Sequence, residues 1–484
     1  MKSDKIIDAI GSIGDDLIES AVKPRLKAKK GRKKWLIPSV AAALVLVIGA
    51  TLFFSPDKTP IDVAAKAGVI AQAQYPEQIK YPEGEDRNDI YYEMEYDAWN
   101  NQLKEKRNKY GAGVDISSFL KSSIPEFLSN AGEENLVYSP LNVYMALSML
   151  TEVTDGQSRA QILDLLGYKD IDTLRKEANY IWNACYNDDG TYSSILASSI
   201  WLRNDLEYKE KTLKSLAERY FASSFSGEMG TPEYNKAIQD WLNEQTEELL
   251  EEQISEIRTE SDTVMMLATT LYFSAKWSEW FEESQNTQDV FKAKSGDKTC
   301  EFMNQTLLDS FYVGDNFSAA KISFNNNQGE MWFMLPDEDV DAVKLASDKD
   351  ALKFISTNGK DGAEEISDSR INISVPKFDV SSQIQMKDGL KNLGVTDIFE
   401  FASSNFSPLT DDTDVIVSDA LHGARVKIDE EGCTAAAYTV FTMTGGGVSM
   451  GKEFDFVLNR PFMFVITSPN GLPLFTGIVN NPQG

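Results

Sequence analysis

Histidine is nearly absent from the 484-residue sequence: His422 is the one example. A zinc site of the HExxH type needs two histidines, so that class of metalloenzyme is excluded. Hydrolases that pair a serine or cysteine nucleophile with a histidine have one candidate base here, but no GxSxG or comparable nucleophile setting accompanies it. We therefore expect a non-enzymatic protein in which His422 is buried and hydrogen-bonded within the strand-like run 415–428.

Cysteine is also scarce. Cys185, Cys300 and Cys433 each lie more than a hundred residues apart with no CxxC pair, so neither a zinc knuckle nor a disulfide framework is expected. At least one thiol must remain unpaired within the chain. Gly445, Gly446 and Gly447 lack the following Lys-Ser/Thr of a phosphate loop, which indicates an exposed loop. No metal or cofactor is predicted.

Basic residues are outnumbered, with 47 Lys and Arg against 75 Asp and Glu, for a net charge of −28. This charge repels phosphate backbones, so nucleic acid is excluded as an expected partner. The imbalance is uneven: residues 1–34 carry +5, which leaves −33 on the other 450 residues. The two parts of the chain are therefore expected in different compartments.

An uncharged stretch separates these two parts. Residues 35–54 (WLIPSVAAALVLVIGATLFF) contain 20 residues without a charge, the length needed to cross a hydrocarbon core of about 30 Å. The basic cluster before them predicts a single-pass membrane protein with residues 1–34 cytoplasmic and the remainder extracellular, the span serving as a signal anchor. The alternative is a signal peptide that is cleaved and a secreted protein.

The chain after the span is expected to form a linker and one domain. Residues 55–110 mix Pro, Gly and charge, which predicts an extracytoplasmic linker. Residues 111–484 show helical and strand patterns without an internal repeat, which predicts one α+β domain with a large sheet. Thr231-Pro232 begins a predicted helix. Strands are predicted at 331–335, 371–375 and 462–466, and a hairpin turn at 468–471.

The segment 427–444 (KIDEEGCTAAAYTVFTMT) is compatible with a strand. With a period of two, its first face is small near Gly432 and becomes apolar toward Met443. Three glycines and a polar stretch follow, which favours exposure to solvent and to proteases. From pattern alone, an edge strand followed by a loop is the simpler interpretation.

Several motifs follow one another in order between residues 110 and 482. They are Asn135–Leu141 with 146–163, Leu271–Trp277 with Phe281, Val375–Phe378, Leu393–Phe399, His422–Gly432, and Asn459–Phe462 with 474–482. Together these motifs resemble those of the serpins. The resemblance implies the serpin fold: many helices around a large mixed β-sheet, two smaller sheets and an exposed reactive-centre loop.

The resemblance also implies a mechanism. Serpins are suicide substrates of serine proteases: the protease attacks the loop, and the loop inserts into the large sheet as a new strand before the acyl-enzyme is hydrolysed. Small hinge residues favour the inhibitory members. The hinge implied here comprises Glu430, Glu431, Gly432, Cys433, Thr434, Ala435, Ala436 and Ala437. Cys433 and Tyr438 depart from the family pattern, and Tyr438 is expected to face solvent after insertion.

A polar cluster under the sheet, the shutter, is implied at Ser139, Asn142, Thr269 and His422. Asn142 stands where serine is usual and Thr269 where asparagine is usual, so the amide is expected to have moved across the cluster. Counting from Glu430 places the scissile bond at Gly446–Gly447; counting back from Pro461 gives Met450, and Met443, Thr444 and Val448 are further alternatives.

The candidate residues at the scissile bond are small or medium and uncharged, so elastase-like or subtilisin-like proteases, including host-derived ones, are the expected partners of a monomeric inhibitor. A non-inhibitory serpin-fold carrier or surface binding protein is the alternative.

Overall fold

The computed structural model describes residues 67–82, 90–110, 114–412, 415–418, 420–433 and 451–483. All of them lie in one compact unit. The predicted cytoplasmic segment 1–34 and membrane span 35–54, together with loop residues 434–450, lie outside the described residues. Within the described residues, no helix has both the length and the apolar character needed to cross a bilayer.

The helices and short 3₁₀ turns alternate with strands along the chain. They are α4 (Ile90–Tyr110), α5 (Ser117–Leu128), α6 (Pro140–Val153), α7 (Gly156–Leu166), α8 (Ile171–Cys185), α9 (Glu210–Arg219), α10 (Pro232–Gln245), α11 (Glu251–Ser255), η1 (Glu283–Gln285), η2 (Asn325–Asn327), α12 (Ala342–Leu345), α13 (Lys349–Ser356), α14 (Met386–Asn392) and η3 (Asp397–Phe399).

One sheet has eight strands among the described residues, in the order β1-β5-β4-β6-β14-β13-β12, with β3 on β4. Its strands are β1 (Gly68–Ala71), β3 (Asn187–Asp188), β4 (Tyr192–Arg203), β5 (Ala222–Gly227), β6 (Met265–Lys276), β12 (Phe378–Gln385), β13 (Leu421–Ile428) and β14 (Gly432–Cys433). The β4–β5 pair is parallel and the others are antiparallel, so this is the predicted mixed sheet.

The remaining strands form a single nine-stranded sheet among the described residues, in the order β15-β11-β8-β9-β10-β16-β17-β2, with β7 on β8. They are β2 (Leu136–Tyr138), β7 (Thr287–Ala293), β8 (Gly296–Val313), β9 (Phe317–Ser323), β10 (Glu330–Pro336), β11 (Glu364–Pro376), β15 (Glu453–Val457), β16 (Phe462–Thr467) and β17 (Pro473–Val479). The prediction of two smaller sheets was wrong in this respect. The long strand β8 pairs with both β9 and β11, which joins the two sets.

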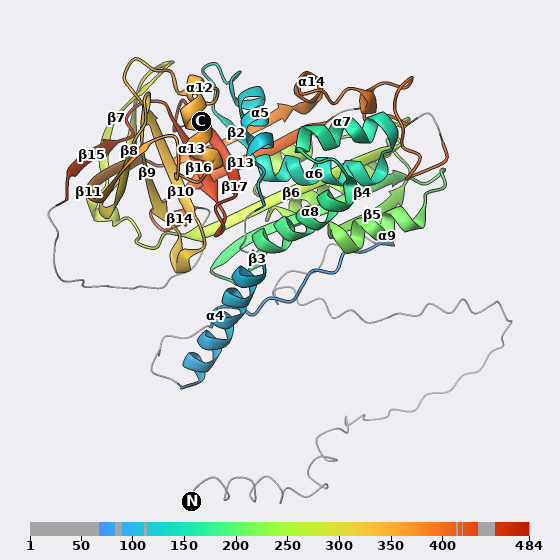
Figure 1. The fold of residues 1–484 in the computed structure, drawn as a ribbon, viewed down its shortest axis with the longest axis horizontal. Helices are drawn as coiled ribbons and strands as arrows, with labels where there is room; N and C mark the ends of the chain where they lie inside the picture. The colour runs from blue at the N-terminus through green and yellow to red at the C-terminus, as the bar shows by residue number, and fades with distance from the viewer. Residues whose placement is uncertain are drawn as a thin grey trace, which may run out of the picture. The chain divides into compact units, whose positions relative to one another are not determined.

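Helices cover both faces of the eight-stranded sheet. Figure 1 shows α6, α7 and α8 together over this sheet, and α6 and α8 pack on β6 and β4. On β4, β5 and β6 a separate apolar cluster brings Trp201 and Phe225 against Tyr234 and Trp241 of α10. The predicted start of α10 is confirmed, because Thr231 caps it by accepting a hydrogen bond from Tyr234 N. A sheet covered on both sides needs apolar residues on both faces, and β4 is buried along most of its length.

The segment predicted to be a solvated linker is folded over 67–82 and 90–110. β1 adds to the free edge of β5, and the Tyr75 ring stacks on Trp182 with ring centroids 5.6 Å apart. The composition of this segment is polar, but two of its aromatic side chains, Tyr75 and Trp99, meet partners about 90 to 110 residues away. The linker prediction was therefore wrong for these two stretches.

Helix α4 is attached to the β3–β4 hairpin by its buried side chains and is seen beside β3 in Figure 1. The Trp99 indole, 2% exposed, donates to Asp189 Oδ2 at 3.1 Å. Lys106 Nζ donates to the carbonyl of Tyr186, and burial lowers its pKa to about 8. Arg107 donates to the carbonyls of Asn326 and Asn327 at 3.1 and 3.0 Å, so α4 bridges the hairpin and the η2 turn.

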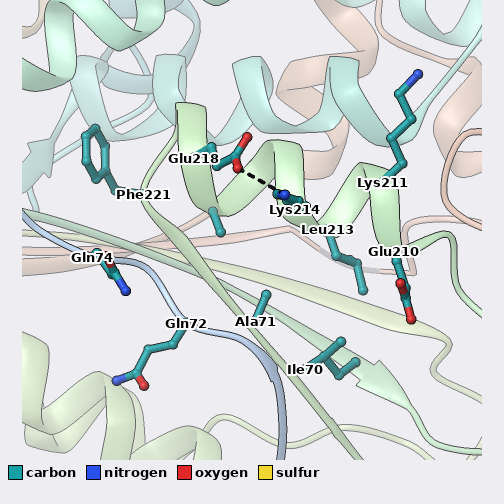
Figure 2. A pocket seen from close by; sticks show the side chains of 11 residues that line it. Ile70, Ala71, Gln72, Gln74, Glu210, Lys211, Leu213, Lys214, Glu218 and Phe221 are labelled. Atoms are coloured by element: carbon teal, nitrogen blue, oxygen red, sulfur yellow. Dashed lines mark ion pairs between the residues drawn. The ribbon is translucent and has the colours of Figure 1, made fainter. Parts of the chain in front are cut away.

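β1 and α9 border an open groove with a volume of about 970 Å³ (Figure 2). Ile70, Leu213 and Phe221 supply its apolar side chains, and the pair Lys214–Glu218 lies at its rim. The groove therefore lies beside the edge strand of the sheet.

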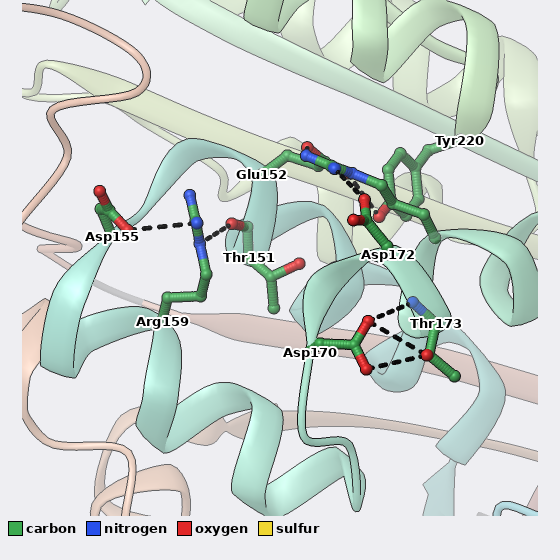
Figure 3. A network of polar contacts seen from close by, with 9 residues as sticks. Thr151, Glu152, Asp155, Arg159, Asp170, Asp172, Thr173 and Tyr220 are labelled. Carbon is green, nitrogen blue, oxygen red and sulfur yellow. Dashed lines mark hydrogen bonds and ion pairs between the residues drawn. The ribbon is translucent and has the colours of Figure 1, made fainter.

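A buried carboxylate joins three helical segments (Figure 3). Glu152 in α6, 4% exposed, accepts from Arg175 Nε at 2.6 Å and Nη2 at 2.7 Å. The hydroxyl of Tyr220, which follows α9, donates to Glu152 Oε1 at 3.0 Å. Burying a carboxylate is costly unless it is paired and hydrogen-bonded, so these contacts fix α6, α8 and the end of α9 relative to one another.

Candidate functional site: the hinge and the gap beside it

The predicted hinge begins inside the eight-stranded sheet. β14 contains two residues, Gly432 opposite Lys276 and Cys433 opposite Ala275 on β6, and Cys433 also lies opposite Ile428 on β13. Gly432 has no room for a side chain, because an added Cβ would lie 2.2 Å from the carbonyl oxygen of Ala275. Cys433 is 2% exposed. The residues expected to start an inserted strand therefore already occupy a strand position.

The turn that leads into β14 is held by main-chain and indole hydrogen bonds. Trp277 N donates to Glu431 O at 3.0 Å, and the Trp277 indole donates to Asp429 O at 2.9 Å. Phe281 N donates to Glu430 O at 3.0 Å. The Trp277 ring stacks on Phe324 with ring centroids 5.2 Å apart, which connects this turn to the second sheet.

Glu430 ties the hinge to the start of β12 and to the second sheet. Its carboxylate pairs with Lys377 at 2.5 Å and accepts from Asn286, while Lys377 also pairs with Glu301 at 3.2 Å. Burial alone would raise the pKa of Glu430, but the hydrogen bonds from Lys377 and Asn286 outweigh it and hold the pKa below its usual value. Lys377, Asn286 and Glu301 were not among the predicted site residues. Only the Val-Pro-Lys-Phe motif pointed to one of them.

Beyond β14, the strands on either side of the hinge do not pair. The structure describes every residue of β6 and β13, and each pairs with β14 but not with the other. A small cavity of about 10 Å³ lies between them, bordered by Leu271 and Tyr272 on β6 and by Gly423 and Ala424 on β13. We call the space between β6 and β13 beyond β14 the β6–β13 gap. It is the position that a longer β14 would fill.

Three of the four predicted shutter residues meet at one end of this gap, where the Ser139 hydroxyl and the His422 ring accept hydrogen bonds from main-chain N–H groups. Ser139 is the N-cap of α6, and its hydroxyl accepts from Asn142 N at 3.3 Å and donates to Leu474 O at 2.6 Å. Ser139 N donates to His422 Nε2 at 3.0 Å. The expectation of a buried, hydrogen-bonded His422 is therefore met, at 5% exposure.

Thr269 contributes to this cluster through its main chain. Asn142 Nδ2 donates to the carbonyl oxygen of Thr269 at 3.2 Å. The amide at position 142 thus reaches β6 by itself, and the bond does not depend on the residue type at 269.

Burial controls the protonation of His422. It lowers the pKa of the imidazole to about 4, so the ring is neutral at pH 7. A neutral ring can accept a hydrogen bond at Nε2, whereas a protonated ring carries a proton on both nitrogens. The bond from Ser139 N therefore requires the neutral form.

The other predicted site residues, Thr434, Ala435, Ala436 and Ala437 of the hinge and the candidate scissile positions Met443, Thr444, Gly446, Gly447, Val448 and Met450, lie outside the described residues. Their assignments remain predictions.

The sequence that forms this arrangement matches the model of a known protein family. The model described as serpin (serine protease inhibitor) matches residues 117–482, well over half of the chain. The chain belongs to the serpin family. The matched residues include the hinge, the turn that precedes it and the shutter cluster.

The matches to curated relatives of this serpin cover nearly the whole length of those relatives. A serine protease inhibitor of Cyanea capillata is 26% identical over 384 residues, which cover 76% of this chain and 96% of that protein. Serpin-ZX of Arabidopsis thaliana is also 26% identical, and the match covers 72% of this chain and 92% of that protein.

Solved structures share the fold. The native state of the thermophilic serpin tengpin aligns with a TM-score of 0.67 at 24% identity, covering 86% of this chain and 99% of that one. A complex of thyroxine-binding globulin with thyroxine aligns with a TM-score of 0.63 at 19% identity, covering 76% of this chain. Serpin folds therefore occur in a carrier as well as in inhibitors, and the fold alone does not distinguish the two activities.

Proposed function

We propose that this serpin is an extracellular suicide inhibitor of serine proteases that works by inserting its loop into the β6–β13 gap. The observation that carries the proposal is β14, since Gly432 and Cys433 already occupy the first two positions of a strand between β6 and β13. The chain that follows, Thr434–Ala437, has small side chains that such a strand can bury. A carrier needs no such sequence.

The covalent step is an acyl transfer that stops at the acyl-enzyme. The protease serine oxygen attacks the carbonyl carbon of the residue before the scissile bond, Gly446 in the preferred assignment. The C–N bond to Gly447 breaks, and the new amino terminus leaves with the proton taken from the serine. The acyl-enzyme ester persists when loop insertion distorts the oxyanion hole and the triad on which attack by water depends.

Strand insertion provides the free energy for this distortion. About a dozen added residues at about 1 kcal/mol net per hydrogen bond give on the order of 10 kcal/mol. Burial of Phe441 and Met443 on the core face adds to this value. An amount of that size is sufficient to deform a protease site, because folded domains are stable by only about 5–15 kcal/mol.

The register of β14 predicts which residues would lie beside Tyr438 in an inserted strand. Continued along β6 and β13, it brings position 438 opposite Thr270 and Gly423. Thr270 is 6% exposed, so on this register β6 would cover part of the Tyr438 ring; the expectation that Tyr438 faces solvent after insertion stays a prediction. The space beside Gly423 is open, because a Cβ added there would meet no atom within 4 Å. The glycine leaves space for the tyrosine ring.

The preferred targets are elastase-like or subtilisin-like proteases, because the candidate scissile residues are uncharged. Residues 35–54 are proposed to anchor the monomer in the cell membrane, with cleavage and secretion as the alternative. If the anchor is correct, the full chain sediments with membranes and residues 55–484 remain soluble. Recovery of the intact full chain in the soluble fraction would disprove it.

The inhibitory mechanism is tested by incubating residues 55–484 with elastase and with subtilisin. We expect an SDS-stable covalent complex, and the mass of the released C-terminal fragment identifies the scissile bond. Ala435→Arg places a charge in the inserting strand and should convert the inhibitor into a substrate. An unchanged stoichiometry of inhibition in this variant would refute insertion.

A non-inhibitory carrier is the second candidate. It predicts cleavage without a covalent complex and no rise in melting temperature after cleavage of the loop. If the cleaved protein melts at a much higher temperature but forms no complex with these enzymes, the loop still inserts and the target protease differs.

A further inference from the structure

An exposed tryptophan lies just after β6, next to the turn that leads into β14. The described part of the chain contains seven tryptophans, and six of them are at most 6% exposed, whereas Trp280 is 40% exposed. Its neighbours Trp277 and Phe281 are buried, at 3% and 2% exposure. A large aromatic side chain that stays in water between buried neighbours is typical of a surface that binds another protein.

The main chain around Trp280 is held on both sides. Ser278 N donates to Ser323 O at 2.9 Å, and Phe281 N donates to Glu430 O at 3.0 Å. Ordering a flexible segment at an interface costs free energy, and here that segment is already ordered. The Trp280 ring would therefore lose little conformational entropy when a partner covers it.

The surface around Trp280 is acidic. The sequence contains no Lys or Arg between Lys276 and Lys292. Four exposed carboxylates lie on this stretch and on the turn before β14: Glu279, Glu282, Glu283 and Glu431. Lys276 interacts with one of them, and Lys377 is already paired with two other carboxylates. A partner that covers Trp280 therefore has to bring positive charge, because like charges that face each other across an interface cost free energy.

This surface is continuous with the hinge. Trp277 N donates to Glu431 O at 3.0 Å, and Glu431 is followed directly by Gly432 and Cys433 of β14. Under the proposed mechanism, the loop that the protease attacks begins directly after Cys433. Trp280 therefore lies close to the point at which this loop starts.

We propose that Trp280 and the four carboxylates around it form a docking surface for the target protease, and that this protease is an elastase-like enzyme with a basic surface beside its active-site cleft. This inference rests on the proposed inhibitory function and narrows its partner. The carboxylates steer the encounter, and the tryptophan holds the encounter complex while the loop enters the cleft. The surface takes no part in strand insertion, so it affects the rate of association and not the fraction of protease that is trapped.

The test measures the second-order rate constant for inhibition of a basic elastase by the full chain. Trp280→Ala and the triple variant Glu279→Lys, Glu282→Lys, Glu283→Lys should each lower this constant about tenfold at low ionic strength. Added salt should lower the rate constant of the wild type but not that of the triple variant. The stoichiometry of inhibition and the melting temperature should stay at the wild-type values in both variants.

The matched control reverses three exposed carboxylates near the other end of β6: Glu256→Lys, Glu260→Lys and Asp262→Lys. These residues precede Met265, where β6 begins, whereas Trp280 follows the end of that strand. The change in net charge is the same in both triple variants, and the control should change the rate constant by less than about twofold. An equal loss of rate in both triple variants would overturn the proposal, because net charge alone would explain it. A Trp280→Ala variant that associates as fast as the wild type would also overturn it.

The failure of the proposed function gives a different result. Cleavage of the wild type without a stable complex would disprove the inhibitory mechanism. The rate constant for cleavage of the loop would then replace the rate constant for inhibition, and the same comparison of variants would decide whether the docking surface exists.

Discussion

At the scale of single residues, His422 beside the β6–β13 gap is sensitive to pH, because burial lowers the pKa of its imidazole to about 4. The unfolded chain binds a proton on this imidazole below pH 6.5, whereas the native protein does so below about 4. Between these values the unfolded state binds more protons. The contribution of His422 to stability is therefore complete above pH 6.5 and is lost as the pH falls to 4.

The first prediction follows from this difference. Acidification from pH 7 to 4 should cost about 3 kcal/mol of unfolding free energy through His422 alone, at about 1.4 kcal/mol per pKa unit. Denaturant unfolding at several pH values measures the loss. Because His422 is the sole histidine, an NMR titration reports its pKa without assignment. His422→Gln should remove this part of the pH dependence, and an unchanged profile would contradict the argument.

The second prediction concerns Gly423. Gly423→Leu should leave the uncleaved protein folded, because a Cβ at this position meets no atom within 4 Å. The leucine would, however, compete with Tyr438 on insertion, so more inhibitor should be consumed per protease inactivated, by several-fold. Tyr438→Ala should relieve the effect of Gly423→Leu in the double variant. Additive effects of the two substitutions would rule out the shared position.

At the scale of elements, strict periodicity made some parts of the fold predictable. The apolar residues Ile371, Ile373 and Val375 lie in β11, and the runs 331–335 and 462–466 lie in β10 and β16. The turn at 468–471 joins β16 to β17 as expected. In each of these elements, the local sequence pattern and the tertiary contacts favour the same secondary structure.

Other elements depend on distant partners and gave no local signal. α4 buries few side chains, chiefly Trp99 and Leu103, among many charged ones. Its partners, Tyr186 and Asp189, are about 80 to 90 residues away in sequence. The Asn142–Thr269 bond was missed for a similar reason: it uses a main-chain carbonyl, which carries no sequence signature.

The third prediction tests the attachment of α4. Trp99→Ala should cost about 3–5 kcal/mol, because a large indole is lost from a buried site and Asp189 loses a donor. Trypsin should then cut faster after Lys106 and Arg107, which the attached helix protects through their bonds to Tyr186, Asn326 and Asn327. Met94→Ala on the same helix, 64% exposed, is the control and should change stability by less than about 0.5 kcal/mol. Equal protection in all three proteins would contradict the assigned contacts.

For the whole molecule, the three thiols report on which part opens first. Cys185, Cys300 and Cys433 are all buried, and none of the three forms a disulfide. Cys185 and Cys300 lie in a long helix and a long strand, and burial raises the pKa of Cys185 to about 12. Cys433 lies in a strand of two residues. Short elements open at lower free energy than the core, so the three sites should differ in their rate of exposure.

The fourth prediction is a thiol-labelling experiment with Ellman's reagent. We expect one thiol to react in the native protein well before the other two, and all three to react at once in denaturant. Cys433→Ala should remove the early phase, while Cys300→Ala should retain it. Release of all three thiols at the rate of global unfolding would show that β14 opens only with the whole fold.

The unpaired stretches of β6 and β13 have one more consequence. Beyond β14 each is a strand edge whose main-chain groups pair with no strand among the described residues, and an unpaired edge is a template for pairing with another extended chain. If the predicted loop of one copy entered the gap of the next copy, the contact would link molecules head to tail without closing a ring. Under the proposed mechanism, a high protein concentration would then lower inhibition, because copies that fill one another's gaps form filaments that no protease can engage.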